Sequence, residues 1–169
     1  MKKLMLIMVC GLPGTGKSHL SRELAKRLGA EYLNSDSIRN RTLEERTYSE
    51  EEKARIYSLM GEEASRLLKE GKDVIVDATF YLGRYRRMMK EAADGAGTRF
   101  FAILCVLGED ELRKRFEKRK GEKSESEADF DVYLKVKEIF EPMELERIEL
   151  DMSLPEEEML GRVLAYVGR

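Results

Sequence analysis

The chain of 169 residues contains no tryptophan, no glutamine, one histidine and two cysteines. Cys10 and Cys105 are too few for a disulfide scaffold, and both lie in apolar runs, so we expect buried, reduced thiols in a cytoplasmic protein. No apolar run approaches the roughly 20 residues that a membrane span needs. The first apolar run, residues 4–10, is also too short for a signal peptide, so we expect none.

The chain also lacks a charge of one dominant sign. Its 33 acidic residues against 31 lysines and arginines give a formal net charge of -2. This balance disfavours a protein that binds polyanions over its whole surface, although a local basic groove remains compatible with it. The length suits one domain, and no repeat, low-complexity tract or linker divides residues 1–169.

The most informative segment is residues 11–18, which fits the phosphate-binding loop pattern G-x-x-x-x-G-K-[ST]. Residues 4–10 before it form an unbroken apolar run of the length of a buried strand. Residues 18–28 after it place leucines at helical spacing and end at Gly29, a helix-stopping residue. Strand, glycine loop and helix N-terminus together form an anion site, so we expect the chain to bind a nucleoside triphosphate.

Two side chains of this loop have expected roles in chemistry. Lys17 would bridge the outer phosphates, and the Ser18 hydroxyl would ligate Mg²⁺. The residues expected to contact the nucleotide here are Gly11, Pro13, Gly14, Thr15, Gly16, Lys17, Ser18 and His19.

Apolar runs and helical patterns alternate along the rest of the chain, which predicts an α/β domain with a parallel sheet. The expected strands after the first are residues 31–34, 73–77, 100–107 and 147–151. The expected helices after the first are residues 49–70, 83–93, 109–120, a segment from about 130 to 140, and 155–167.

Three classes of protein share such a loop: nucleotide switches, motor ATPases and small kinases. A GTPase needs a guanine-reading N-K-x-D, which the sequence lacks, and the D-x-x-G at residues 94–97 precedes a strand instead of following one. A motor or AAA-type machine needs further subdomains, for which little chain remains. A kinase needs an acceptor site and a cationic lid, and candidates for both are present.

The acceptor candidates follow two predicted strands, where ligands of parallel sheets bind. Asp36 could take the proton of an attacking hydroxyl, and Arg39 could hold the acceptor or the transferring phosphate. The alternative is that Asp36 caps a short helix and Arg39 is a solvated charge. Asp77 could hold magnesium through water or position the acceptor, or it could be a turn residue.

The cationic candidates lie on two helices. Among Arg84, Arg86 and Arg87, one is expected to point inward at the rim of the site. Arg115 and Arg119 share one helical face and could close over the triphosphate, although a run of charges is usually a solvated face.

Five segments together resemble one known family. They are residues 11–18, Ser35-Asp36-Ser37-Ile38-Arg39, Tyr48-Ser49, Val74-Ile75-Val76-Asp77-Ala78-Thr79-Phe80 with Arg86, and Phe140-Glu141-Pro142. The chain is similar to the small P-loop kinases of the zeta-toxin, polynucleotide-kinase and gluconate-kinase-like group, often labelled AAA-domain predicted kinases. The resemblance implies a three-layer α/β P-loop NTPase fold, a five-stranded parallel sheet of order 2-3-1-4-5, helices on both faces and a short helical lid over about 113–135.

The same resemblance implies ATP with Mg²⁺ and transfer of the γ-phosphoryl group to a hydroxyl. It implies that Asp36 activates the acceptor, that Arg39 and Arg86 bind it, and that Arg119 is a lid arginine, with Arg115 as a second candidate. The chain departs from the family at His19, where threonine is usual. A ring nitrogen could replace the threonine contact to the α-phosphate, but a helix-surface position is favoured.

The leading hypothesis is therefore an ATP-dependent kinase of a hydroxyl acceptor. The net charge slightly favours a small metabolite over the 5′-hydroxyl of a nucleic acid. A nucleotide-dependent binding or switch module is the alternative from another class.

Overall fold

The computed structural model describes residues 2–119 and 130–169. The strands are β1 (Met5–Cys10), β2 (Glu31–Asn34), β3 (Val74–Asp77), β4 (Arg99–Val106) and β5 (Ile148–Asp151). The helices are α1 (Lys17–Leu28), α2 (Ser35–Thr42), α3 (Glu50–Lys69), α4 (Gly83–Gly95), α5 (Glu109–Arg119), α6 (Phe130–Ile139) and α7 (Glu156–Val167).

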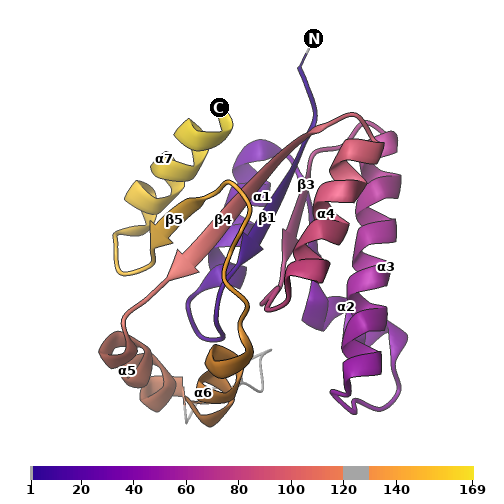
Figure 1. The fold of residues 1–169 in the computed structure, drawn as a ribbon. Helices are drawn as coiled ribbons and strands as arrows, with labels where there is room; N and C mark the ends of the chain where they lie inside the picture. Colours follow the sequence, from indigo (N-terminus) through magenta and orange to yellow (C-terminus); the bar gives the residue numbers. More distant parts are fainter. Residues whose placement is uncertain (1, 120–129) are drawn as a thin grey trace.

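The five strands form one parallel sheet of order β2-β3-β1-β4-β5, which confirms the expected fold class. Central strand β1 is buried along its whole length, because helices cover both faces of the sheet. Its alternate side chains enter two cores, one shared with α3 and α4 and one with α1 and α7. Figure 1 shows these helix layers, with α5 and α6 beyond the carboxyl ends of the strands.

A third, small core joins α5 and α6 to the phosphate loop. Leu112, Phe116 and Tyr133 are buried in it, and Leu12 of the loop packs against them. The expected lid therefore begins and ends in helices that contact the loop. Its central part, residues 120–129, lies outside the described residues.

Helix α2 was expected only in the alternative in which Asp36 caps a short helix. In α2 only Ile38 and Arg39 are buried, so the segment has no apolar stripe by which a helix could be recognised. The Asn34 side chain caps it by accepting a hydrogen bond of 3.1 Å from the Ser37 N–H. The hypothesis that Asp36 is the cap is therefore wrong.

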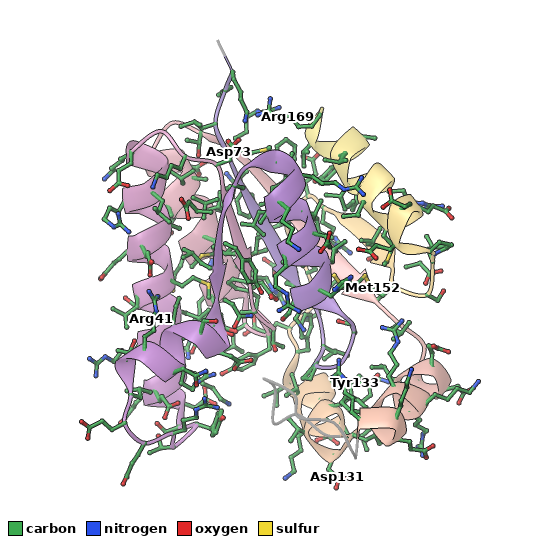
Figure 2. All side chains as sticks on the ribbon, turned by 180° about the vertical axis from the view of Figure 1, so that it is seen from behind. Arg41, Asp73, Asp131, Tyr133, Met152 and Arg169 are labelled. Carbon is green, nitrogen blue, oxygen red and sulfur yellow. The ribbon has the colours of Figure 1, made fainter. Side chains whose placement is uncertain are left out.

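The opposite end of the sheet is held by a buried carboxylate. Asp73 accepts a hydrogen bond from the Met5 N–H at 2.9 Å and pairs with Lys2 at 2.7 Å. Figure 2 shows Asp73 near Arg169 at this end, far from Tyr133 and Met152. No helix within residues 2–119 and 130–169 is long and apolar enough to cross a bilayer.

Candidate functional site

Gly11, Gly14 and Gly16 of the phosphate loop have positive φ, and at the first two a Cβ would also clash with a neighbouring residue. A Cβ on Gly11, where φ is +148°, would lie 2.6 Å from the Cys105 carbonyl oxygen. A Cβ on Gly14, where φ is +83°, would lie 2.4 Å from the Phe116 ring. The glycines therefore allow both the left-handed turn and the close packing of α5 on the loop.

The loop is also held by its own side chains. Lys17 Nζ donates to the Leu12 carbonyl at 3.0 Å, and the buried Thr15 hydroxyl donates to the same oxygen at 2.9 Å. The Lys17 ammonium is thus held against the backbone of the loop.

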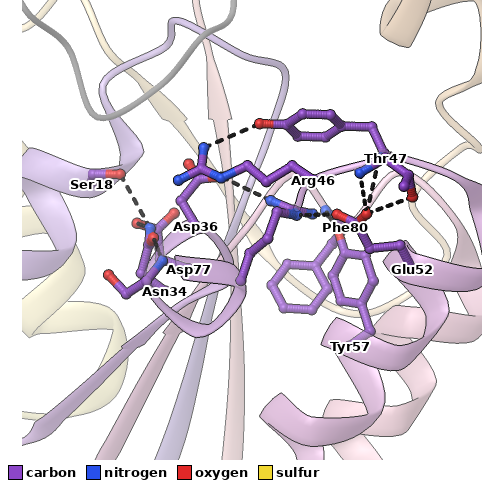
Figure 3. Close-up of polar contacts among 12 residues, drawn as sticks. Ser18, Asn34, Asp36, Arg46, Thr47, Glu52, Tyr57, Asp77 and Phe80 are labelled. Carbon is purple, nitrogen blue, oxygen red and sulfur yellow. Dashed lines mark hydrogen bonds and ion pairs between the residues drawn. The ribbon is translucent and has the colours of Figure 1, made fainter. Parts of the chain in front are cut away.

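Asp77 ends β3 beside the loop, because β3 pairs with β1 and places Asp77 opposite Val9. The Tyr32 hydroxyl donates to Asp77 Oδ2 at 2.6 Å, and Asn34 Nδ2 donates to the same oxygen at 3.0 Å. Asn34 Nδ2 also lies 3.5 Å from Ser18 Oγ (Figure 3). Burial and the neighbouring Asp77 carboxylate raise the pKa of Tyr32, so its hydroxyl stays a donor at neutral pH.

This group fits the expected Mg²⁺ site. Asp77 is 1% exposed, and within the described residues its partners are the neutral Tyr32 and Asn34, with no ion pair to a cation. A buried carboxylate without a cationic partner is costly, and a divalent ion would compensate it. The described residues contain no group of three or more Asp, Glu, His or Cys side chains that could hold a metal ion.

Asp36 lies in the first turn of α2, beside this group (Figure 3). Its side chain is 35% exposed, and its Oδ1 accepts a hydrogen bond from Arg39 Nη1 at 2.9 Å. Burial raises the pKa of Asp36 although Arg39 opposes the shift, and the Asp77 carboxylate adds to it. A partly exposed carboxylate with a raised pKa is suited to accept a proton.

Arg39 is fixed from two sides. Glu52, in the first turn of α3, accepts from Arg39 Nε at 2.9 Å, and both side chains are almost fully buried. Glu52 also accepts from the Thr47 N–H and hydroxyl and from the Tyr48 N–H. Burial alone would raise the pKa of Glu52, but these bonds outweigh it and lower the pKa to about 2.

Tyr48 covers the Arg39 guanidinium, whose carbon lies 5.0 Å from the ring centroid. The Tyr48 hydroxyl accepts a hydrogen bond from Arg46 at 3.2 Å. The backbone of Tyr48 has a φ of +53°, which places this bulky residue in the left-handed region. Such strain persists only where surrounding contacts over-determine the backbone, and it is common at functional sites.

The two arginines expected on the lid face lie on α5. Arg115 donates to the Thr15 carbonyl at 3.4 Å and to the Met152 carbonyl at 3.0 Å, so it joins the phosphate loop to the segment after β5. Arg119 follows one helical turn later and is the last residue of α5. His19, which departs from the family pattern, is exposed and lies 3.1 Å from Glu156 of α7.

Arg86 points inward as expected, but it lies in the core instead of at the rim of the site. It is 1% exposed, and its guanidinium donates to the carbonyls of Phe80, Tyr81, Glu141 and Pro142. These bonds connect the segment after β3 to the segment that leaves α6. The described contacts of Arg86 are therefore with backbone carbonyls, and its role in binding the acceptor stays a prediction.

Sequence reasoning missed Glu52 and Tyr32. The pattern Ser49-x-x-Glu52 is a capping-box signature, and Ser49 does accept from the Glu52 N–H at 3.1 Å. Tyr32 and Asn34 are two residues apart on β2, so they share one face of the strand. Both signals were present in the sequence, but neither indicates which distant partner the side chain meets.

The model of a family described as AAA domain matches residues 6–143. The chain belongs to this AAA domain family. It is 28% identical over 136 residues to the uncharacterized protein Rv2004c of Mycobacterium tuberculosis, covering 73% of this chain and 27% of that protein. The chain therefore spans about a quarter of the length of the curated relatives it matches.

Solved structures show the same fold at low sequence identity. A sugar kinase from Janibacter sp. HTCC2649 superposes with a TM-score of 0.77 at 16% identity, covering 99% of this chain and 95% of that one. The Mycobacterium tuberculosis APS kinase CysC, solved in complex with AMPPNP and APS, has a TM-score of 0.74 at 20% identity and full coverage of both chains. The AAA domain chain described here thus has a kinase-like P-loop fold.

Proposed function

We propose that this AAA domain protein is an ATP-dependent kinase that transfers the γ-phosphoryl group to a hydroxyl of a small metabolite. The observation that carries the proposal is Asp36, a partly exposed carboxylate with a raised pKa beside the Ser18–Asn34–Asp77 group. A switch protein also needs the phosphate loop, but it does not need a carboxylate beside the loop that takes the proton of an acceptor hydroxyl.

The donor side would hold ATP on the backbone N–H groups of the loop and of the start of α1. Lys17 would contact the β- and γ-phosphates, and Mg²⁺, held by Ser18 and through water by Asp77, would neutralise charge on them. Arg119 would approach the transferring group, and Arg115 would hold α5 against the loop. The nucleotide contacts proposed for the loop are Gly11, Pro13, Gly14, Thr15, Gly16, Lys17, Ser18 and His19.

The acceptor side would activate and orient the hydroxyl. Asp36 takes the hydroxyl proton as the acceptor oxygen bonds to the γ-phosphorus, while the bond to the leaving ADP oxygen breaks. Arg39 is held by two carboxylates and keeps Asp36 in position, so the acceptor meets a preorganised base. The protein that resembles this chain and was solved with AMPPNP supports ATP as the donor. The two buried free thiols are compatible with a cytoplasmic location, which we also propose.

The test is a screen with γ-labelled ATP and Mg²⁺ over sugars, nucleosides and 5′-hydroxyl oligonucleotides. We expect the wild-type chain to label one class of small acceptor, and Lys17→Ala to abolish labelling because it removes charge stabilisation at the transferring group. Labelling of oligonucleotides instead would favour a polynucleotide kinase. Release of labelled phosphate alone, with no labelled acceptor, would contradict the kinase proposal.

A further inference from the structure

The wall of the acceptor side is residues 36–53, which run from the first turn of α2 to the first turn of α3. This segment contains six acidic and four basic residues, so its net charge is -2. A site that recognises a phosphate, sulfate or carboxylate group usually presents arginine or lysine to it. The composition of the wall has the opposite bias.

The cations of this wall already have acidic or aromatic partners. Arg39 lies between the carboxylates of Asp36 and Glu52, each at 2.9 Å. Arg41 pairs with Glu63 at 3.0 Å, and Lys53 pairs with Glu50 at 3.3 Å. Arg46 donates to the Tyr48 hydroxyl, and its charge also acts on Asp36. An anionic acceptor would have to compete with carboxylates for Arg39, Arg41 and Lys53, and with the Tyr48 hydroxyl for Arg46.

The same wall presents one aromatic ring to solvent. Tyr48 is 40% exposed, although its ring lies over Arg39 and its hydroxyl accepts from Arg46. Its backbone is held in the left-handed region by the bond from its N–H to Glu52. Since Arg39 contacts both Tyr48 and Asp36, the ring stands one side chain away from the proposed base. An exposed ring held in this way is suited to stack on a flat or ring-shaped ligand.

This inference rests on the proposed kinase function. From the charge of the wall and the position of Tyr48 we infer that the acceptor is an uncharged ring compound, a sugar or a nucleoside, which stacks on Tyr48 and presents a hydroxyl to Asp36. The Asp36 carboxylate then takes the hydroxyl proton, and no phosphate on the acceptor is needed for binding. A sugar and a nucleoside share this chemistry, and the experiment separates them.

The experiment compares acceptors that differ by one phosphate: glucose with glucose 1-phosphate, and adenosine with 3′-AMP. Transfer from Mg·ATP gives the acceptor KM, and saturation-transfer NMR in the presence of Mg·AMPPNP gives binding without turnover. Tyr48→Leu removes the ring, while Tyr48→Phe is the matched control that keeps it. Loss of one stacked ring corresponds to a decrease of about tenfold in the affinity for the ligand.

We expect the uncharged member of one pair to have an acceptor KM at least about tenfold lower than its phosphorylated partner. Tyr48→Leu should raise that KM by about tenfold with the KM for ATP unchanged, whereas Tyr48→Phe should stay within about twofold. A preference for the phosphorylated members, an unchanged acceptor KM in Tyr48→Leu, or no NMR contact with either member would overturn the inference. Ring contacts that depend on Tyr48 without any transfer would support stacking of an uncharged ring on Tyr48, but would reject both the kinase function and the role of that ring compound as an acceptor.

Discussion

Replacing Glu52 by glutamine should destabilise the protein strongly, although the two side chains have the same shape. The Glu52 carboxylate is almost fully buried and accepts hydrogen bonds from Thr47, Tyr48 and Arg39. A glutamine amide has one acceptor oxygen, so its NH₂ group must face one of these donors, and the Arg39 charge loses one of its two carboxylates.

Breaking a buried ion pair from one side costs about 3–5 kcal/mol. We take about 3 kcal/mol here, because Asp36 still compensates Arg39 in the variant. For a chain of this size about 1 kcal/mol shifts Tm by about 2–4 °C, so Glu52→Gln should lower Tm by about 6–12 °C at pH 7.

The effect should depend on pH with a definite sign. The pKa of Glu52 is lowered from 4.5 to about 2 in the folded chain. Its carboxylate therefore contributes its full stability above pH 4.5, and this contribution is lost as the pH falls towards about 2. The difference in Tm between wild type and Glu52→Gln should shrink accordingly between pH 5 and pH 3.

Thermal and urea unfolding, followed by circular dichroism at pH 7, 5 and 3, measure the loss of stability in Glu52→Gln relative to wild type. Glu51→Gln is the matched control, since Glu51 lies in the same first turn of α3 but is exposed. If both variants have the same Tm at pH 7, or if their difference does not shrink in acid, the account of Glu52 as the buried anchor of Arg39 is wrong.

Three further predictions concern the loop, the metal site and the base. Gly14→Ala should weaken nucleotide binding at least about tenfold, because the alanine Cβ would meet the Phe116 ring and the backbone is left-handed there. Isothermal titration calorimetry measures the affinity, and the double variant Gly14→Ala/Phe116→Leu should recover part of the loss. Tyr32→Phe removes a hydrogen bond to Asp77, so it should raise the Mg²⁺ concentration needed for half-maximal enhancement of fluorescent-ADP binding, with binding in EDTA unchanged. The raised pKa of Asp36 predicts that kcat/KM falls on acidification at a higher pH than an ordinary aspartate would give, and equal activity down to pH 4 would contradict it.

The central part of the fold could be predicted from local sequence. The apolar run, the glycine loop and the spaced leucines identify β1, the loop and α1. The position of β3 beside β1 followed from the family resemblance, and the structure confirms it. Helix α2 was predicted only as an alternative, because its eight residues bury only Ile38 and Arg39. Asn34 is both the last residue of β2 and the N-cap of α2, so no turn sequence separates the strand from the helix.

Within the candidate site, only contacts between residues close together in the sequence could be predicted. Asp36 and Arg39 are three residues apart on a helix, and the structure brings them into contact. Glu52 reaches Arg39 across a loop, and Arg86 reaches the Glu141 carbonyl 55 residues away. Periodicity indicates which side chain points inward, but the partner it meets depends on tertiary packing.

The central claim is that Asp36 is the base of a phosphoryl transfer. The direct test is the single-turnover rate of transfer from Mg·ATP to the acceptor found in the screen, measured for wild type and Asp36→Asn with ATP affinity measured in parallel. We predict that Asp36→Asn loses at least about 100-fold in rate, the lower range for removal of a general base, while its ATP affinity stays within about threefold. A rate close to that of wild type at equal ATP affinity would contradict the account.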